Sequence, residues 1–275
     1  MVTLSAFADE ISKNLPESLQ ILKSCGMSCM ELRGFDDTNV MKLTDAQVAY
    51  AKAELGKAGF SVGCIATPIG KIQVTDPFEP QLVLMRRAIE LAGVLGSKHI
   101  RVFAYYIPKG DDPAKWRAEV LNRMGQLVAL ATGTGLTVVL ENEEGLYSDT
   151  IVRCADVIGA LKVPHLKLAF DPSNLVTIGP KPFSEAWPLA KPLLGYVHVK
   201  DWIVARKVMV PAGQGDAEWP QLLPAIKAAG YSGHIALEPH LSDAGQFSGF
   251  SGPDMFRKAH EALTGLLKQA GIEYR

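Results

Sequence analysis

Four residues of the chain have side chains that together suit a divalent cation. They are 30, 27 and 40 positions apart and lie at the ends of, or within, short apolar runs: Glu141, Asp171, His198 and Glu238. If these residues meet, their three carboxylates repel one another, and some of them would have to hold protons. A divalent cation removes that conflict. Three oxygens and one nitrogen suit Mn²⁺, Mg²⁺ or Co²⁺, with Zn²⁺ as an alternative.

Regular elements must bring these residues together, and the chain alternates short apolar runs with longer helical patterns. The runs that we predict as strands cover 2–8, 28–32, 60–66, 99–103, 136–140, 166–170, 195–199 and 234–237. The helical patterns that follow them cover about 15–25, 44–58, 78–95, 113–132, 148–161, 183–190, 218–229 and 253–269. Several of the helical patterns end at a glycine, as helices commonly do. The stretch 207–215, rich in glycine and proline, is predicted to be irregular.

Eight strand–helix units in 275 residues predict an α/β protein with one (β/α)8 TIM barrel, a fold that typically uses about 250 residues. An open doubly wound sheet would favour a GxGxxG turn after the first strand, where this chain has ADEISKN. No linker or composition shift divides the chain, so we expect a single TIM-barrel domain over residues 1–275.

The carboxyl ends of barrel strands form the active-site face, so the four residues should share one rim. A single polar residue at a strand end often only caps a helix or forms a salt bridge. Four on consecutive strands are harder to explain in that way. The sequence therefore predicts a metal site at this rim.

Composition and charge narrow the classes of protein. The net charge is −1, so no general basic field attracts nucleic acid, and we expect no nucleic-acid partner. The four cysteines form no CxxC pair and no zinc-finger spacing, which is typical of free thiols in a reducing compartment. The N-terminus lacks the pattern of a signal peptide, and no apolar stretch of about 20 residues would span a membrane. We therefore expect a cytoplasmic protein without a membrane partner.

The segments around the four residues resemble those of a known superfamily. The similar pieces are LEN at 140–142, FDPSN at 170–174, VHVKD at 197–201 and ALEPH at 236–240. In this order and spacing, the chain resembles the xylose-isomerase-like TIM barrel superfamily, which includes sugar isomerases, epimerases and inosose dehydratases. The opening FADE and the later ELR add weaker similarity. The resemblance covers essentially the whole chain.

This resemblance implies a mechanism and a metal site. In the family, the four equivalent residues bind one divalent metal, and the equivalents of Glu141 and Glu238 also act as the acid–base pair. The metal chelates a carbonyl and an adjacent hydroxyl of the substrate and stabilises the enediolate that forms. One glutamate removes the proton next to the carbonyl and the other returns it. The implied function is a divalent-metal-dependent isomerase or epimerase of a small sugar or polyol ketone.

Two features differ from particular relatives. Sugar epimerases of the family often carry His three residues after the sixth-strand Asp, whereas this chain has Asn174, whose amide cannot take up a proton. The multi-zinc DNA-repair endonucleases of the superfamily need several histidines at the rim, where only His198 and His240 are expected. The other histidines fall at strand starts or in the last helix: His99, His165, His234 and His260. This pattern argues against DNA repair.

Further side chains near the rim are candidates for substrate binding. Lys200 lies two residues after His198, so both side chains point the same way, although Lys200 could instead pair with Asp201 or a glutamate. The other substrate-binding candidates are Asn174, His240, Glu31 and Arg33. Weaker candidates are Arg206, Lys207 and four aromatic residues for which packing is the simpler explanation: Phe7, Trp202, Phe247 and Phe250.

Alternative functions stay open beside the isomerase or epimerase. A dehydratase of the inosose type would start from the same enediolate, and a non-catalytic sugar-binding barrel would use the metal only to hold its ligand. A metal-free Schiff-base aldolase would need a depressed pKa at Lys200, which neighbouring acids would raise instead. The sugar, its phosphorylation, the native metal and the oligomeric state, with a homo-oligomer as one option, are left open at this stage.

Overall fold

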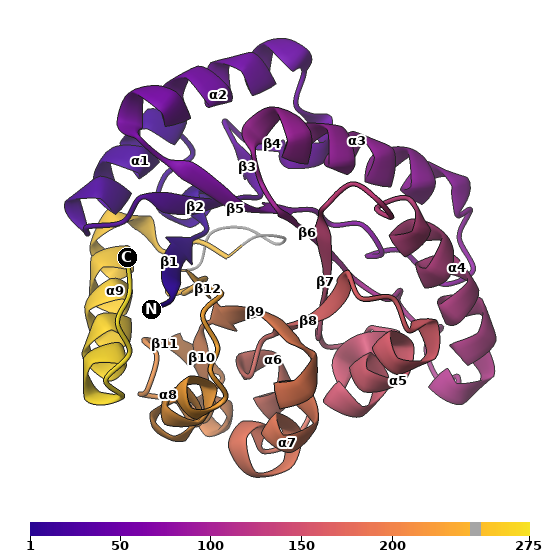
Figure 1. Cartoon of the computed structure of the whole chain (residues 1–275). Coiled ribbons are helices and arrows are strands. Elements are labelled where there is room, and N and C mark those ends of the chain that lie inside the picture. Colours follow the sequence, from indigo (N-terminus) through magenta and orange to yellow (C-terminus); the bar gives the residue numbers. More distant parts are fainter. Residues whose placement is uncertain (243–248) are drawn as a thin grey trace.

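The computed structural model describes residues 1–242 and 249–275, and a ring of parallel strands forms its centre (Figure 1). Within the described residues, eight strands pair in the order β1-β12-β9-β8-β7-β6-β5-β2. Their bounds are β1 Thr3–Ala6, β2 Cys29–Leu32, β5 Ser61–Ala66, β6 His99–Val102, β7 Thr137–Glu141, β8 Leu166–Phe170, β9 Leu194–Val199 and β12 His234–Leu237. Neighbours in this order run parallel. The predicted TIM-barrel fold is confirmed.

The two edge strands of this sheet, β1 and β2, meet where the barrel closes. A parallel bridge joins Phe7, the residue after β1, to Glu31 of β2. Phe7 also donates its backbone N–H to the carbonyl oxygen of Leu237 in β12 (3.1 Å). Phe7 is therefore held from both sides at the seam of a nearly closed barrel.

Side chains alternate between the barrel interior and the surrounding helices, because a strand has a two-residue period. Inward side chains, most of them small, fill the middle of the barrel around Phe7 and Tyr196 in a buried cluster that consists of Phe7, Cys64, Ala66, Val139, Ala169, Tyr196 and Ala236. The strand register pairs Glu141 with Ala169 and His198 with Ala236. Asp171 and Glu238 stand two residues beyond these two alanines. Both carboxylates therefore point inward at the carboxyl ends of their strands.

Helices cover the outer face of the barrel, close to the ranges predicted from the sequence (Figure 1). Their bounds are α1 Leu15–Ser24, α2 Asp45–Ala58, α3 Glu79–Leu95, α4 Arg117–Ala129, α5 Ile151–Leu161, α8 Trp219–Ala228 and α9 Gly252–Gln269. Local signals fix their ends: at α2, Thr44 and Gln47 form a capping box, and Gly59 ends the helix at φ 75°. Among the described residues, no helix combines the length and apolarity that crossing a membrane requires.

The segment after β8 differs from the single helix predicted over 183–190. It contains α6 (Ser173–Val176), a π-helical turn over Pro182–Ala186, α7 (Trp187–Ala190) and a 3-10 turn over Lys191–Leu193. The prolines Pro182, Pro188 and Pro192 recur through this segment and lack the backbone N–H that helical hydrogen bonds need. Proline spacing therefore divides this segment into short turns.

The loop after β9 is more ordered than predicted, because part of 207–215 forms a hairpin. β10 (Asp201–Ile203) pairs antiparallel with β11 (Val208–Val210), and a smaller hairpin of β3 (Gly34–Phe35) with β4 (Thr38–Asn39) follows β2. The buried carboxylate of Asp201 organises the larger loop. It accepts backbone N–H groups at 2.8–3.0 Å from Trp202, Gly213, Gly215 and Ala217. Both oxygens of Asp201 are thus used by the loop, and Lys200 pairs elsewhere.

Asp201→Asn should destabilise the protein, because an amide replaces one acceptor oxygen by an NH₂ group that faces backbone donors. Each oxygen accepts two of the four hydrogen bonds, so we expect the free energy of unfolding to fall by about 1–3 kcal/mol. Urea denaturation followed by circular dichroism measures this loss. Asp216→Asn is the matched control in the same loop, since Asp216 is exposed and accepts a backbone N–H from Val204. An equal loss in both variants would contradict the role of Asp201.

Candidate functional site

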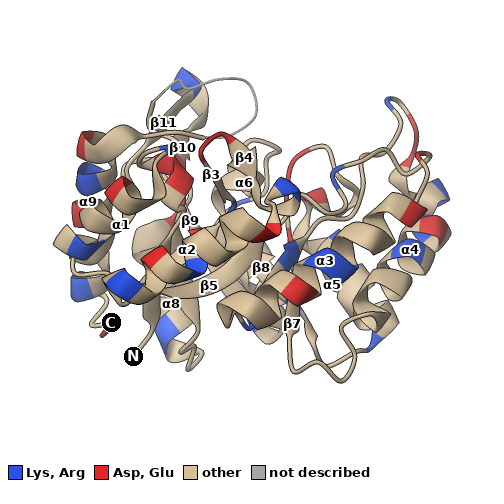
Figure 2. Cartoon of the chain, turned by 90° about the horizontal axis from the view of Figure 1, so that it is seen from above, with Lys and Arg blue, Asp and Glu red and all other residues tan. Residues whose placement is uncertain are grey.

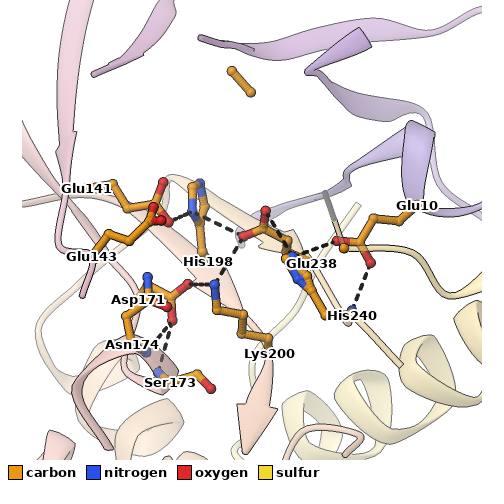
Figure 3. A network of polar contacts seen from close by, with 12 residues as sticks. Glu10, Glu141, Glu143, Asp171, Ser173, Asn174, His198, Lys200, Glu238 and His240 are labelled. Atoms are coloured by element: carbon orange, nitrogen blue, oxygen red, sulfur yellow. Dashed lines mark hydrogen bonds and ion pairs between the residues drawn. The ribbon is translucent and has the colours of Figure 1, made fainter. Parts of the chain in front are cut away.

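Four ionisable side chains meet at the carboxyl end of the barrel (Figure 3). Glu141 ends β7, Asp171 follows β8, His198 lies in β9 and Glu238 follows β12. Each residue offers one ligand atom, these atoms lie within 4.8 Å of one another, and all four residues are buried. The structure therefore brings together the residues that the strand spacing singled out.

Each glutamate of this cluster has one oxygen held by an arginine. Arg101 Nη1 donates to Glu141 Oε2 (3.1 Å), and Arg33 Nη1 donates to Glu238 Oε1 (2.9 Å). The other two oxygens are directed at His198 Nδ1, which is 3.0 Å from Glu141 Oε1 and 3.9 Å from Glu238 Oε2. Both glutamates thus present one oxygen to the same central position.

Neighbouring charges decide the protonation of the two glutamates. Burial alone would raise the pKa of Glu141, but His198 and Arg101 outweigh burial and lower that pKa to about 2. Burial is also outweighed at Glu238, where Lys200 and other positive neighbours hold the pKa below its usual value. Both side chains are therefore carboxylates at neutral pH.

Asp171 is oriented by its own turn and by the side chain of Asn142. Asn142 Nδ2 donates to the carbonyl oxygen of Asp171 (2.8 Å), and Asn142 Oδ1 accepts the backbone N–H of Asp171 (2.9 Å). Asp171 Oδ1 accepts the N–H groups of Ser173 (2.9 Å) and Asn174 (3.2 Å). Asp171 Oδ2 is left 2.9 Å from Lys200 Nζ. Burial raises the pKa of Asp171 to about 6, against the opposing charge of Lys200.

The ring of Phe7 lies between the two arginines of the site. Its centroid is 4.9 Å from the Arg33 guanidinium and 5.3 Å from that of Arg101. His198 packs against the same ring edge-on, with 5.3 Å between centroids. Cation–π contacts of this kind stabilise charges that are removed from water. Phe7 therefore supports the charged groups directly, and it does more than fill space.

Three buried atoms of the cluster have no hydrogen-bond partner within the described residues: Asp171 Oδ2, His198 Nδ1 and Glu238 Oε2. Charged neighbours approach Asp171 Oδ2 and His198 Nδ1 but do not meet hydrogen-bond geometry. Folded proteins satisfy nearly all buried polar atoms, so such atoms require an explanation. Two carboxylate oxygens and an imidazole nitrogen, with Glu141 as a fourth ligand, form a donor set that fits one divalent cation.

Lys200 and Asn174, both predicted to bind substrate, contact the cluster in different ways. Lys200 Nζ lies 2.9 Å from Asp171 Oδ2 and 3.7 Å from Glu238 Oε2. Burial would lower the pKa of Lys200, but these acids outweigh it and raise that pKa, which argues against a Schiff-base role. Asn174 Nδ2 donates to the carbonyl oxygen of Asn142 (2.9 Å), so its amide stabilises the turn that holds Asp171.

Arg33 and Glu31 lie two residues apart but have different surroundings. Arg33 reaches the cluster and also donates from Nε to Asp9 Oδ2 (2.7 Å). A strand rises about 3.3 Å per residue, so Glu31 sits about 7 Å deeper in the barrel. Glu31 is fully buried, and its Oε1 accepts hydrogen bonds from Ser5 and Tyr196. This differs from the expected position at the rim, because these bonds tie β1, β2 and β9 together inside the barrel.

His240 lies beside the cluster and contacts Glu10, a residue that the sequence analysis did not single out. His240 Nε2 is 3.6 Å from Glu238 Oε1 and 3.2 Å from Glu10 Oε1. The backbone N–H of His240 donates to Glu10 Oε2 (2.8 Å). Burial lowers the pKa of His240 to about 3, so its imidazole is neutral. Glu10 follows the first strand within FADE, and the rule that strand ends supply the rim could have identified it.

Arg101 was also missed by the sequence analysis. It lies inside β6 and is nearly fully buried. A charged residue within an otherwise apolar strand was the available signal, because a buried charge must find a partner.

The remaining histidines lie away from this rim. His99 and His234 begin β6 and β12 and pack against Tyr196 with ring centroids 5.1 Å apart, while His165 precedes β8. Over residues 1–242 and 249–275, the potential metal ligands at the rim thus include His198 and His240 but no larger set of histidines.

The weaker candidates lie mostly on loops at the same end of the barrel. Arg206 and Lys207 form the turn of the β10–β11 hairpin, which stands at the upper end of the molecule in Figure 2 together with β3 and β4. Trp202 and Phe250 are partly exposed, and Phe247 lies outside the described residues. Basic and acidic residues alternate over the helices seen in Figure 2, in keeping with the net charge of −1.

Comparisons with known proteins give one family match, two similar curated proteins and solved structures of the same fold. The family model described as xylose isomerase-like TIM barrel matches residues 19–266. A probable L-ribulose-5-phosphate 3-epimerase of Mycoplasma pneumoniae is 26% identical over 219 residues, which cover 76% of this chain and 71% of that protein. A 2-oxo-tetronate isomerase of Cupriavidus necator is 27% identical over 157 residues, 55% of this chain and 58% of that enzyme. The solved structure of the IolI protein with a bound zinc atom has a TM-score of 0.78 at 14% identity, over 98% of this chain and 99% of that one.

Asn142→Asp should destabilise the protein at this rim, although the asparagine and aspartate side chains have the same shape. The new oxygen would face the carbonyl oxygen of Asp171 in place of an N–H donor, so we expect the free energy of unfolding to fall by about 1–3 kcal/mol. Urea unfolding in the presence of a chelator measures this loss without any contribution from metal binding. Asn122→Asp on α4 is the control, because that side chain accepts a hydrogen bond from Gln126 and a carboxylate still can. Similar losses of unfolding free energy in both variants would contradict the role of the Asn142 side chain in holding Asp171.

Proposed function

Because the chain belongs to the xylose isomerase-like TIM barrel family, we propose that it is a divalent-metal-dependent isomerase or epimerase of a small sugar or polyol ketone. Its relatives include a probable L-ribulose-5-phosphate 3-epimerase and a 2-oxo-tetronate isomerase. The observation that carries the proposal is the arrangement of Glu141 and Glu238. Each directs one oxygen at a common position while an arginine holds the other.

One divalent cation is part of this proposal, with Glu141, Asp171, His198 and Glu238 as its ligands. When bound, it would polarise the substrate carbonyl and make the neighbouring C–H bond more acidic. The unpartnered atoms Asp171 Oδ2, His198 Nδ1 and Glu238 Oε2 support this assignment. Mn²⁺, Mg²⁺ and Co²⁺ suit the mixed oxygen and nitrogen donors, and Zn²⁺, which the IolI structure carries, suits them as well.

Glu141 and Glu238 are the proposed acid–base pair. One removes the proton from the carbon next to the carbonyl, and its electron pair passes into a planar enediolate. The other, a carboxylate in the free protein, must first take up a proton from solvent, and it then delivers that proton to the opposite face in epimerisation. In isomerisation a proton reaches the neighbouring carbon instead. The substrate is neither oxidised nor reduced overall. β7 and β12 are separated by β8 and β9 in the barrel, so the two glutamates approach the centre from different sides.

The residues around the pair have supporting roles in the proposal. Lys200, close to both Asp171 and Glu238, holds a substrate oxygen, and His240 borders the substrate as a neutral imidazole. Asn174 orients the carboxylate of Asp171, and Arg33 orients that of Glu238. Glu31 supports the site from inside the barrel, through its hydrogen bonds with Ser5 and Tyr196. The proposed partner is a small sugar or polyol and not a nucleic acid or a membrane, in a cytoplasmic protein for which a homo-oligomer is one option.

Transfer of solvent deuterium to the substrate tests the reaction type. In D₂O, a panel of ketoses, ketose phosphates, 2-oxo-tetronate and inososes should contain a compound that gains deuterium at the carbon next to the carbonyl, as read by NMR. Dialysis against EDTA should abolish the exchange, and Mn²⁺ should restore it. A dehydratase would instead release a product that has lost water. Exchange that persists in metal-depleted protein would refute the metal-dependent mechanism.

Glu141→Gln and Glu238→Gln test the acid–base pair. Each amide cannot accept a proton, so kcat should fall about 100- to 10,000-fold while substrate affinity is largely kept. Metal analysis must accompany each variant, so that loss of turnover with retained metal is distinguished from loss of the ion. Glu143→Gln is the control at the same rim, where Glu143 pairs with Lys71 (2.6 Å), and its kcat should change only a few-fold. A sugar-binding barrel would show affinity without turnover in every form, including the wild type.

A further inference from the structure

A second group of potential metal ligands adjoins the first and shares Glu238 with it. Glu10, Glu238 and His240 each offer an atom, and these atoms lie within 4.8 Å of one another. In Figure 3, Glu10 and His240 lie on the side of Glu238 away from His198. Glu10 is fully buried, and within the described residues neither its Oε1 nor His240 Nε2, 3.2 Å away, has a hydrogen bond.

The guanidinium of Arg33 lies close to the carboxyl groups of Glu10 and Glu238. Its Nη1 donates to Glu238 Oε1 (2.9 Å), its Nε donates to Asp9 Oδ2 (2.7 Å), and its Nη2 lies 3.7 Å from Glu10 Oε1. Nη2 also donates to the carbonyl oxygen of Gly249 (3.3 Å). The Arg33 side chain is only 12% exposed. One fixed positive charge thus sits among three acidic side chains, those of Asp9, Glu10 and Glu238.

A guanidinium neutralises acids as a metal ion does, but it cannot share their position with one. It stays protonated at physiological pH, carries only hydrogen-bond donors and has no lone pair for a metal. Its charge also repels a divalent cation at short range. The side chains of Glu10, Glu238 and His240 would otherwise offer oxygen and nitrogen atoms close enough together to hold one cation.

We propose that Arg33 fills a second cation position between Glu10, Glu238 and His240, and that it thereby restricts the site to one metal ion. This inference rests on the proposed function, because it takes the first cluster to be a metal site. Arg33 is then a positioning residue. By holding Oε1 of Glu238, it leaves Oε2 for the metal and prevents Glu238 from bridging two ions.

Arg33→Met tests the proposal, since it removes the charge and the donors but keeps an unbranched side chain. Wild-type and variant proteins are loaded with excess Mn²⁺ and desalted, and the metal per chain is counted by elemental analysis and native mass spectrometry. We expect one ion in the wild type and two in Arg33→Met. Electron paramagnetic resonance should give an isolated Mn²⁺ signal for the wild type and a spin-coupled pair for the variant.

Two further variants control for general effects of the substitution. Arg101→Met removes the other arginine–glutamate pair, that of Glu141, where the described residues offer no second ligand group. It should bind at most one ion. Arg33→Met combined with Glu10→Gln should return to one ion, because the second position then loses a charged ligand.

Thermal unfolding gives an independent measurement. Mn²⁺ should raise the Tm of Arg33→Met more than that of the wild type, since a second ion would bind the native state.

The outcomes separate this inference from the proposed function. One ion in Arg33→Met, or two ions in the wild type, overturns the inference alone. A wild type that binds no ion overturns the inference and the proposed metal site together. If Arg33→Met does not fold, the wild-type count at rising Mn²⁺ still decides, together with Arg33→Lys, which keeps the charge and should bind one ion.

Discussion

Charge compensation among buried carboxylates is the interaction on which the rim of this barrel depends. Glu141, Asp171 and Glu238 are at most 3% exposed, and a buried carboxylate without a partner strongly destabilises a fold. Glu10 is fully buried as well, and burial raises its pKa to about 8. Arg101 in β6, Lys200 after β9 and Arg33 after β2 supply the positive charge. Three atoms of the cluster nevertheless lack hydrogen bonds within the described residues, and the proposed divalent cation would complete the balance of charge.

The barrel makes this arrangement available through the alternation of its strands. Along β8 and β12, the inward positions carry an alanine within the strand and a carboxylate just beyond its carboxyl end, namely Ala169 with Asp171 and Ala236 with Glu238. The small residues below leave the charged side chains close to the axis, where residues from opposite strands can meet. The two-residue period of the strands therefore directs both the carboxylates at the rim and the small side chains beneath them into the barrel.

The same periodicity explains how far the sequence could predict the site. Parallel strands that each follow a helix must end at one rim, so the grouping of the four candidate ligand residues could be deduced from spacing alone. Pairing within the group could not, because it depends on rotamers and loop conformation. Lys200 contacts Asp171 instead of Asp201, and the amide of Asn174 bonds to backbone. Prolines likewise replaced the predicted helix over 183–190 with short turns.

The earlier and the later half of the barrel meet where β6 pairs with β7 and where β1 pairs with β12, and their charges complement each other. Glu141 in β7 is paired with Arg101 in β6, and Glu238 after β12 is paired with Arg33 after β2. A half-barrel containing only the later strands would carry both glutamates without these arginines. The halves are therefore not interchangeable modules: an ancestor that exchanged one half for that of a distant relative would have to inherit the matching arginines as well, so the two halves are constrained to evolve together.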